Sequence, residues 1–103
     1  MKVVFRPAGR RDVILQVGYY IDQNAEHAAE RFPLAVEEAV QQITRQPDMG
    51  PLQHFKGSRW TGLRSWPVPC FEELRIYYLR PQPALIRILR IVHGRRDLGL
   101  LFD

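Results

Sequence analysis

The stretch that decides the fold is ALIRILRIVHGRRDLGLLF, residues 84–102, where a long apolar segment runs into a cluster of charge. Residues 84–92 are almost entirely aliphatic, and Arg87 and Arg90 are the exceptions. A run of this length and composition is typical of a central strand that is covered on both faces. The charged residues 93–97, His-Gly-Arg-Arg-Asp, then mark the point at which the chain leaves the core.

Three shorter segments earlier in the chain also have the composition of strands. Residues 2–6 are rich in β-branched and aromatic side chains, residues 62–68 alternate between two faces, and residues 74–79 are mostly apolar. Pro67 places the second of these strands at a sheet edge or a strand end, because proline cannot donate a ladder hydrogen bond. Residues 80–83, Arg-Pro-Gln-Pro, predict a turn before the last strand.

The segment between the first two strands predicts two helices. The first begins at Pro7, which suits a first helical turn, and ends near residues 22–24. Its apolar residues recur on one face, namely Val13, Ile14, Val17, Tyr20 and Ile21. For the second helix we expect Asn24 as the N-cap, with Glu26 near the positive end of the helix dipole.

The second helix has the strongest periodic signal in the chain. Its apolar residues step by three or four, namely Ala25, Ala28, Ala29, Phe32, Val36, Ala39, Val40 and Ile43. Pro33 interrupts this pattern, because a mid-helix proline loses one backbone hydrogen bond and crowds the preceding turn. We therefore expect either a kink at Pro33 or two helices that meet at Phe32. Residues 46–51, Gln-Pro-Asp-Met-Gly-Pro, end the helix.

These elements give the order β-α-α-β-β-β. This order predicts an α+β fold in which a helical hairpin packs on one antiparallel sheet. The chain has 103 residues, so we expect one domain over residues 1–103 with a core of its own. A further turn of helix over residues 97–102 is compatible with this order.

The net charge of +4 is distributed unevenly along the chain. Residues 1–50 hold six basic and seven acidic side chains and come to −1, whereas residues 51–103 hold nine basic and four acidic side chains and come to +5. Thirteen of the fifteen basic residues are arginine, which binds carboxylates and phosphates through two parallel hydrogen bonds. The basic half therefore indicates either an anionic partner, a nucleic acid or an acidic protein segment, or a merely solvated surface.

Composition also excludes several classes of site. A single cysteine, Cys70, excludes an intramolecular disulfide and a Cys-x-x-Cys metal site. The opening MKVVFRP does not have the pattern of a signal peptide, and no apolar run approaches the roughly 20 residues that span a bilayer. We expect a cytoplasmic protein without a metal or another cofactor.

Three segments of the basic half carry a resemblance to a known family: residues 62–71, 74–78 and 88–98. With the β-α-α-β-β-β order, they resemble the RelE/ParE toxins of bacterial type II toxin–antitoxin pairs, which include plasmid-stabilisation proteins, and are most similar to the ParE branch. The N-terminal half agrees through Ala8, Asp12, Tyr20, Ile21, Ala28, Phe32, Pro47 and Gly50. Cys70 stands where the family most often carries glycine.

The resemblance implies two activities. ParE-like members are described as inhibitors of DNA gyrase that bind the protein and cut no nucleic acid, whereas RelE-like members cut messenger RNA on the ribosome. In both groups an antitoxin tail wraps around the toxin. We therefore expect a toxin that inhibits DNA gyrase and is neutralised by a ParD-like or similar antitoxin in a hetero-oligomer. A ribosome-dependent messenger RNA endoribonuclease is the alternative.

The residue set that the resemblance implies for a ribonuclease is incomplete. If the chain were a ribonuclease, its catalytic residues would be Arg64, Arg75, His93 and Arg96. RNA cleavage needs a base, an acid and cations around the phosphate. The lysine-rich strand of RelE enzymes reads Gly-Leu-Arg-Ser-Trp over residues 62–66 here, and Leu100, Leu101 and Phe102 replace the expected tyrosine. Lys56 and Arg59 could substitute only as cations. The balance favours a protein that is not an enzyme.

A binding protein would instead use its cations and aromatic residues on a surface. The expected residues for target or antitoxin binding are Arg64, Trp66, Arg75, Arg90, Arg95, Arg96 and Phe102. We expect one of Trp60 and Trp66 in the core and the other at a partner surface. The apolar tail over residues 98–102 either folds back on the sheet or is covered by the antitoxin.

Several of these residues also have a structural interpretation. His93 at a strand end is more often structural than catalytic, and Asp97 is its expected partner. Asp97 could equally cap the final turn or pair with Arg90 or Arg75. Those two arginines could instead form an ion-pair cluster with Glu72 or Glu73, since buried charges need partners. We expect Gly94 to supply a backbone shape that other residues resist.

Overall fold

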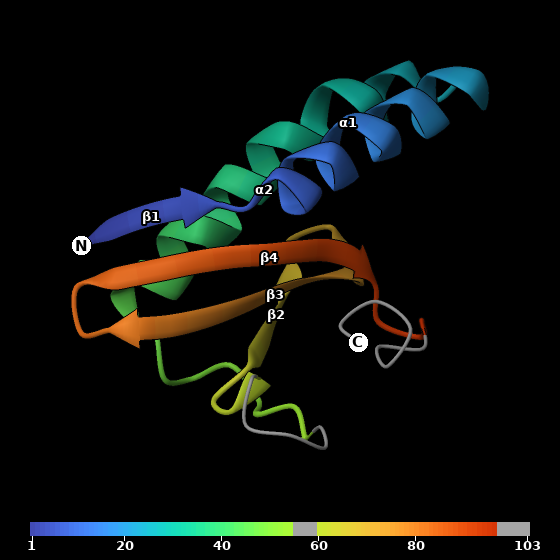
Figure 1. The fold of residues 1–103 in the computed structure, drawn as a ribbon. Coiled ribbons are helices and arrows are strands. Elements are labelled where there is room, and N and C mark those ends of the chain that lie inside the picture. The colour runs from blue at the N-terminus through green and yellow to red at the C-terminus, as the bar shows by residue number, and fades with distance from the viewer. Residues whose placement is uncertain (55–59, 97–103) are drawn as a thin grey trace.

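A computed structural model describes residues 1–54 and 60–96. It contains the strands β1 (Lys2–Phe5), β2 (Arg64–Val68), β3 (Phe71–Gln82) and β4 (Leu85–His93) and the helices α1 (Pro7–Asp22) and α2 (Glu26–Arg45). The expected order and the helical hairpin are confirmed. Both helices lie on one face of the sheet (Figure 1). The predicted helical turn and apolar tail over 97–102 lie outside the described residues.

The sheet has the strand order β1-β4-β3-β2. The pairs β2–β3 and β3–β4 are antiparallel, but β1 runs parallel to β4, from Lys2 opposite Leu85 to Phe5 opposite Ile88. The expected all-antiparallel sheet is therefore wrong for β1, and the sheet is mixed. Parallel neighbours need a long crossover connection, which the two helices and two intervening strands provide.

The core has two parts, one on each face of the sheet. The larger cluster lies under the helices and includes Phe32, Val36, Ala39, Ile43, Ile76, Tyr78, Ile86, Ile88 and Ile91. The smaller cluster, on the opposite face, consists of Leu63, Tyr77, Leu89 and Val92, with Trp60 and Leu79 packed against it. Because β4 contributes to both clusters and lies between β1 and β3, the prediction of a central strand covered on both faces is confirmed.

The start and the middle of α2 differ from the expectations. Ala25 occupies the N-cap position without a side-chain hydrogen bond, and Asn24 instead adopts a left-handed φ of 58° in the connecting loop. The helix then continues through Pro33, so the expectation of two helices meeting at Phe32 is wrong. Buried residues on both sides of the proline keep one continuous apolar face against the sheet, and this packing outweighs the lost hydrogen bond.

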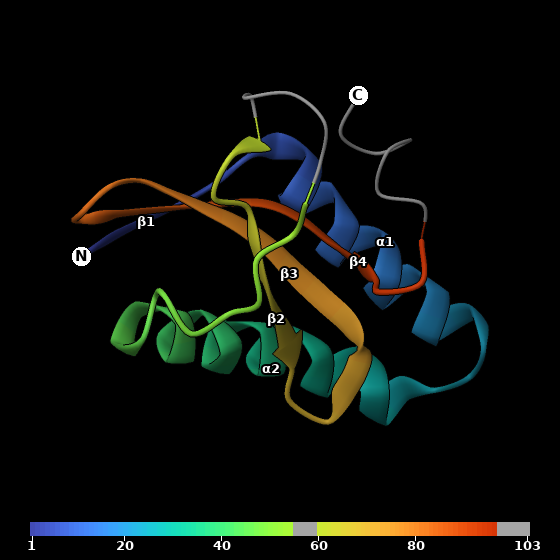
Figure 2. The same cartoon turned by 90° about the horizontal axis from the view of Figure 1, so that it is seen from below.

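The buried face of α1 is narrower than predicted. Val13, Val17 and Tyr20 pack against the larger cluster, but the side chains of Ile14 and Ile21 are 70% and 55% exposed. The helix lies beside β4 at the margin of the sheet, while α2 crosses β2 and β3 (Figure 2). A helix at the margin has the sheet on one side only, so its outer residues remain in solvent.

The predicted turn over residues 80–83 is shorter in the structure. Strand β3 continues to Gln82, and only Pro83 and Ala84 form the turn before β4. The ladder shifts register between Leu79 and Gln82, which accommodates Pro81 inside the strand. Within residues 1–54 and 60–96, no helix is long and apolar enough to cross a membrane.

Candidate functional site

Helix α1 takes over from β1 as the neighbour of β4. Strand β1 ends at Phe5, and the backbone N–H of Arg6 makes the last contact of this kind, a 2.8 Å hydrogen bond to the carbonyl of Ile88. One turn later Gly9 lies so close that an added Cβ would be 3.2 Å from the carbonyl oxygen of Leu89. Glycine thus lets a helix approach the open edge of a strand, where no strand partner remains.

Asp12 completes this contact and is the buried charge of the site. Its carboxylate accepts a 2.9 Å hydrogen bond from the backbone N–H of Ile91 and hydrogen bonds of 2.7 and 2.9 Å from Nε and NH2 of Arg90. This bidentate hydrogen bond raises the pKa of Arg90, although burial opposes it. The expected ion pair of Arg90 with Glu72 or Glu73 is therefore wrong, because Asp12 is its partner.

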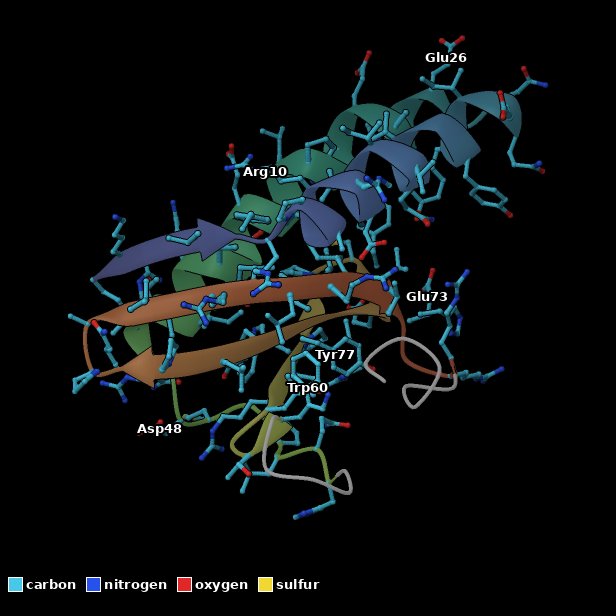
Figure 3. All side chains as sticks on the ribbon, in the orientation of Figure 1. Arg10, Glu26, Asp48, Trp60, Glu73 and Tyr77 are labelled. Carbon is cyan, nitrogen blue, oxygen red and sulfur yellow. The ribbon has the colours of Figure 1, made fainter. Side chains whose placement is uncertain are left out.

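A groove of about 530 Å³ opens beside this pair, between α1 and the end of β4. We call it the α1/β4 groove, and its lining consists of Asp12, Leu15, Gln16, Tyr19, Tyr20, Glu73, Leu74, Arg90, Ile91, Val92, His93 and Arg96. Glu73 lies at the end of the sheet where β4 finishes (Figure 3). The groove therefore combines aromatic and aliphatic walls with groups of both charges. Burial raises the pKa of Tyr20 on its helix wall.

The turn after β4 is fixed by backbone hydrogen bonds. The N–H of Gly94 donates to the carbonyl of Glu73 over 2.8 Å, and the N–H of Arg96 donates to the carbonyl of His93 over 3.1 Å. The N–H of Arg95 donates to Nδ1 of His93 over 3.2 Å. This hydrogen bond favours the tautomer of His93 with its proton on Nε2. Asp97, the partner expected for His93, lies outside the described residues.

Gly94 is explained by close approach. Its φ is not in the left-handed region, so the expectation of an unusual backbone shape is wrong. A Cβ at this position would lie 3.0 Å from Cδ of Arg75 instead. The missing side chain thus lets the aliphatic part of Arg75 pass beneath the turn.

Arg75 belongs to a polar network on the face away from the helices. Its Nε donates to Oγ of Ser65 over 2.9 Å, and Nε2 of Gln53 donates to the same oxygen over 3.1 Å. Ser65 is completely buried. Arg75 also lowers the pKa of Tyr77, but burial raises it more. Arg75 thus joins β3 to β2 and to the segment that follows α2.

Arg64 connects β2 to the loop that follows α2, and Trp66 connects β2 to α2 itself. NH1 of Arg64 donates to the carbonyls of Asp48 and Gly50 over 2.8 and 2.7 Å. Nε1 of Trp66 donates to Oε1 of Gln42 on α2 over 2.7 Å, and the ring packs against the larger cluster. Trp60 packs against the smaller cluster on the other face. Both tryptophans are half-buried, and each packs against one of the two core clusters.

The register separates the residues expected of a ribonuclease. Residues directly opposite each other in a ladder point to the same face of a sheet. Arg75 lies opposite Val92 of the smaller cluster, whereas His93 lies opposite Leu74 of the larger cluster. Arg75 and His93 therefore point to opposite faces, and Arg64 is held by loop carbonyls elsewhere. Only His93 and Arg96 share a groove.

The expected binding residues divide into two groups. Arg64, Trp66, Arg75 and Arg90 have the intramolecular partners given above. Within residues 1–54 and 60–96, the guanidinium groups of Arg95 and Arg96 make no hydrogen bond or ion pair, and both residues are exposed. Phe102, Lys56 and Arg59 lie outside the described residues. Across the described part of the chain, no group of three His, Cys, Asp or Glu side chains could hold a metal ion.

Sequence reasoning missed the role of Asp12 and the helix wall of the groove. One signal for Asp12 was present, because it lies one turn from Gly9 and adjoins the apolar face begun by Val13. A charge on the packed side of a helix needs a partner. Which arginine provides that partner follows only from the pairing of β1 with β4, which aligns the start of α1 with Arg90.

The architecture of this chain occurs in known toxins. The structures of the chromosomal ParDE toxin–antitoxin system from P. aeruginosa include a chain with 15% identity and a TM-score of 0.70, covering 90% of this chain and 95% of that one. A YoeB/ParE toxin from Agrobacterium tumefaciens has 16% identity and a TM-score of 0.58, and the match covers 91% of this chain and 99% of that one. A chain of the YoeB-YefM complex from Staphylococcus aureus has 17% identity and a TM-score of 0.52, and the match covers 91% of this chain and 97% of that one. The chain thus has the fold of these small toxins.

The sequence itself defines the family. Residues 3–98 match the family model described as the ParE toxin of the type II toxin-antitoxin system, parDE. The chain therefore belongs to the ParE toxin family of type II toxin–antitoxin systems. No curated protein matches the sequence.

Proposed function

We propose that this ParE-type toxin inhibits DNA gyrase by binding to it, without cutting nucleic acid. Membership of the ParE family supports this target. The observation that carries the proposal is the separation of Arg75 and His93 on opposite faces of the sheet. A base and a phosphate-binding cation must act on the same nucleotide, and strand alternation turns Arg75 and His93 to different faces. Of the four residues expected of a ribonuclease, this leaves only Arg96 as a cation beside His93.

The exposed turn after β4 is the proposed contact with the target. Arg95 and Arg96 project from a turn that is fixed by two backbone–backbone hydrogen bonds and by the hydrogen bond from the N–H of Arg95 to Nδ1 of His93. The fixed backbone of this turn presents two guanidinium groups to an acidic protein surface, so little backbone entropy is lost on binding. Among the described residues of the basic half, Arg64, Arg75, Arg80 and Arg90 already have partners within the chain.

The proposed antitoxin contact is the α1/β4 groove. The antitoxin is an acidic segment that folds on contact, with its carboxylates near His93 and Arg96 and its apolar residues against Leu15 and Tyr19. The P. aeruginosa and S. aureus relatives were solved as a ParDE system and a YoeB-YefM complex, which supports a bound antitoxin for this chain as well.

The ribonuclease alternative draws on His93 and Arg96, which share the α1/β4 groove. A general base needs a free imidazole nitrogen. Nδ1 of His93 already accepts the N–H of Arg95, and the favoured tautomer carries a proton on Nε2. To act as a base, His93 would have to lose this hydrogen bond, which argues against the alternative.

A paired assay separates the two functions. The purified chain is added to gyrase with relaxed plasmid, and separately to translating ribosomes. The proposal predicts loss of supercoiling while the message stays intact. Cleaved message with normal supercoiling would reverse the assignment. His93→Gln keeps gyrase inhibition under the proposal, whereas an enzyme would lose its cleavage activity with the fold unchanged.

The contact residues are tested in the same assay. Replacing Arg95 and Arg96 together by alanine weakens gyrase inhibition at least about tenfold, because two exposed cations leave the contact. The matched control replaces Arg31 and Arg45, two exposed arginines of α2, and removes the same charge from the other side of the molecule. Equal losses in the two double variants would mean that only the net charge matters.

A further inference from the structure

The outward face of α1 is apolar where a solvent-facing helix surface is normally polar. The side chains of Ile14, Leu15 and Tyr19 are 70%, 63% and 55% exposed. Gly18 lies among them, and a Cβ added there would meet nothing within 4 Å. This face therefore has exposed apolar side chains around an open position, which nothing in the described chain covers.

The residues of this face form a seam along the helix. Arg11, Leu15, Gly18 and Asp22 follow one another at spacings of four, three and four, with Ile14 and Tyr19 on either side. This spacing aligns them on one side of an α-helix, opposite Val13, Val17 and Tyr20, which pack on the core. We call these six residues the α1 seam.

We propose that the α1 seam binds a second copy of this chain, with the two α1 helices antiparallel. A two-fold axis at the level between Gln16 and Val17 places Leu15 of each copy over Gly18 of the other. It also sets Arg11 against Asp22, whereas Ile14 and Tyr19 on the two flanks each face the same residue of the second copy. The Leu15–Gly18 and Arg11–Asp22 contacts each occur twice, as a two-fold interface requires.

Charge and size both favour this occupant. Helix α1 has no acidic residue in its first turn and no basic residue in its last, and Asp22 lies at its C-terminus, which the helix dipole disfavours. Antiparallel pairing sets Arg11 of one copy beside Asp22 of the other and compensates this placement. Parallel pairing would bring like charges together. The open position at Gly18 lets the Leu15 side chain of the second copy approach the backbone.

The interface is confined to one helix of each copy, so the dimer is weak. Interfaces of this size belong to the transient class, and the dimer should dissociate on dilution. This inference goes beyond the proposed function, and its test needs neither gyrase nor antitoxin. Because Leu15 and Tyr19 also belong to the proposed antitoxin contact, the antitoxin and the second copy would compete for this face of α1.

Sedimentation velocity of the purified full-length chain over about a hundredfold range of concentration tests the inference. The sedimentation coefficient should rise from that of a monomer to that of a dimer. Leu15→Glu should keep the chain monomeric throughout. The matched control is Leu34→Glu on α2, where the side chain is 64% exposed and lies outside the α1 seam. It should dimerise like the parent, and circular dichroism checks that both variants are folded.

A charge exchange tests the orientation. Arg11→Asp alone and Asp22→Arg alone each weaken dimerisation at least about fivefold, because two attractive pairs become repulsive. The double variant restores it, since the charges again face opposite charges. The inference would be overturned if the parent chain stays monomeric or if the Leu15→Glu variant still dimerises. It would also be overturned if the double variant dimerises no more strongly than the single variants.

Discussion

At the scale of single residues, Asp12 connects elements that are far apart in sequence. Its carboxylate replaces the strand partner that β4 loses after Ile88 and neutralises Arg90 in the same contact. The side chain of Asp12 is 8% exposed and that of Arg90 is 21% exposed. The pair is thus mostly shielded from water, and loss of either partner leaves a charge poorly solvated.

Removal of the carboxylate should therefore destabilise the fold. Asp12→Ala lowers the free energy of unfolding by about 2–4 kcal/mol, because Arg90 and the N–H of Ile91 both lose their acceptor. Asp12→Asn costs less, since its amide oxygen still accepts from Ile91. Urea unfolding measures both variants, with Glu37→Gln on the exposed side of α2 as the control. An Asp12→Ala variant as stable as that control would contradict this role.

Cys70 is a strained position that glycine would relieve. It adopts a φ of 67° in the two-residue turn of Pro69 and Cys70, between Val68 and Phe71, which pair as the last residues of the hairpin. A residue with a side chain pays about 1 kcal/mol in this region, so Cys70→Gly should raise the stability by about that amount. Cys70→Ala, which keeps a Cβ, is the control and should change little. Equal stability of the two variants in thermal unfolding would argue against strain.

Three tyrosines predict how stability depends on pH. Burial raises the pKa values of Tyr20, Tyr77 and Tyr78 above 10.0. Between the unfolded and folded pKa values, the folded state holds more protons. Stability is therefore fully present below about pH 10 and falls as the pH rises further. Urea unfolding at increasing pH measures this loss, and absorbance at alkaline pH follows tyrosinate formation. A free energy of unfolding that stays constant or increases when the pH is raised above 10 would contradict this prediction.

At the scale of elements, sequence periodicity was sufficient for the helices and strands but not for their neighbours. The apolar face of α2 and the aliphatic run of β4 can each be recognised from a short stretch of sequence. The parallel pairing of β1 with β4 does not, because it depends on contacts across almost the whole chain. For the same reason the partner of Arg90 was missed, and local charges such as Glu72 and Glu73 were considered first. Local signals also misled at Asn24, because its left-handed conformation belongs to the loop.

Pro33 predicts a break in α2, but the packing of the helix against the core keeps it continuous. Pro33→Ala restores a hydrogen bond to the carbonyl of Ala29 inside a continuous helix. The variant should be more stable by about 1–2 kcal/mol, less than the full helix penalty because proline also restricts the unfolded chain. Chemical denaturation compares it with Glu30→Ala, one turn earlier on an exposed site. A destabilised Pro33→Ala variant would mean that the ring itself fills a needed place in the core.

At the scale of the whole molecule, the fold divides the five arginines expected to bind a target or antitoxin into two groups. Arg64, Arg75 and Arg90 hold layers and strands together, and Arg95 and Arg96 extend from the end of β4. The sequence identified these five arginines together, but it could not show which of them are bound within the fold and which are exposed. The face on which each lies depends on register and on the bulge between Tyr77 and Tyr78. Under the proposed function, this division separates the arginines that bind the target from those that stabilise the fold.

Calorimetric titration of the purified chain into purified gyrase, without DNA or nucleotide, tests the central claim most directly. The account predicts saturable binding that weakens when Arg95 and Arg96 are replaced and persists with His93→Gln. No binding to gyrase, together with cleavage of messenger RNA on ribosomes that His93→Gln abolishes, would contradict it.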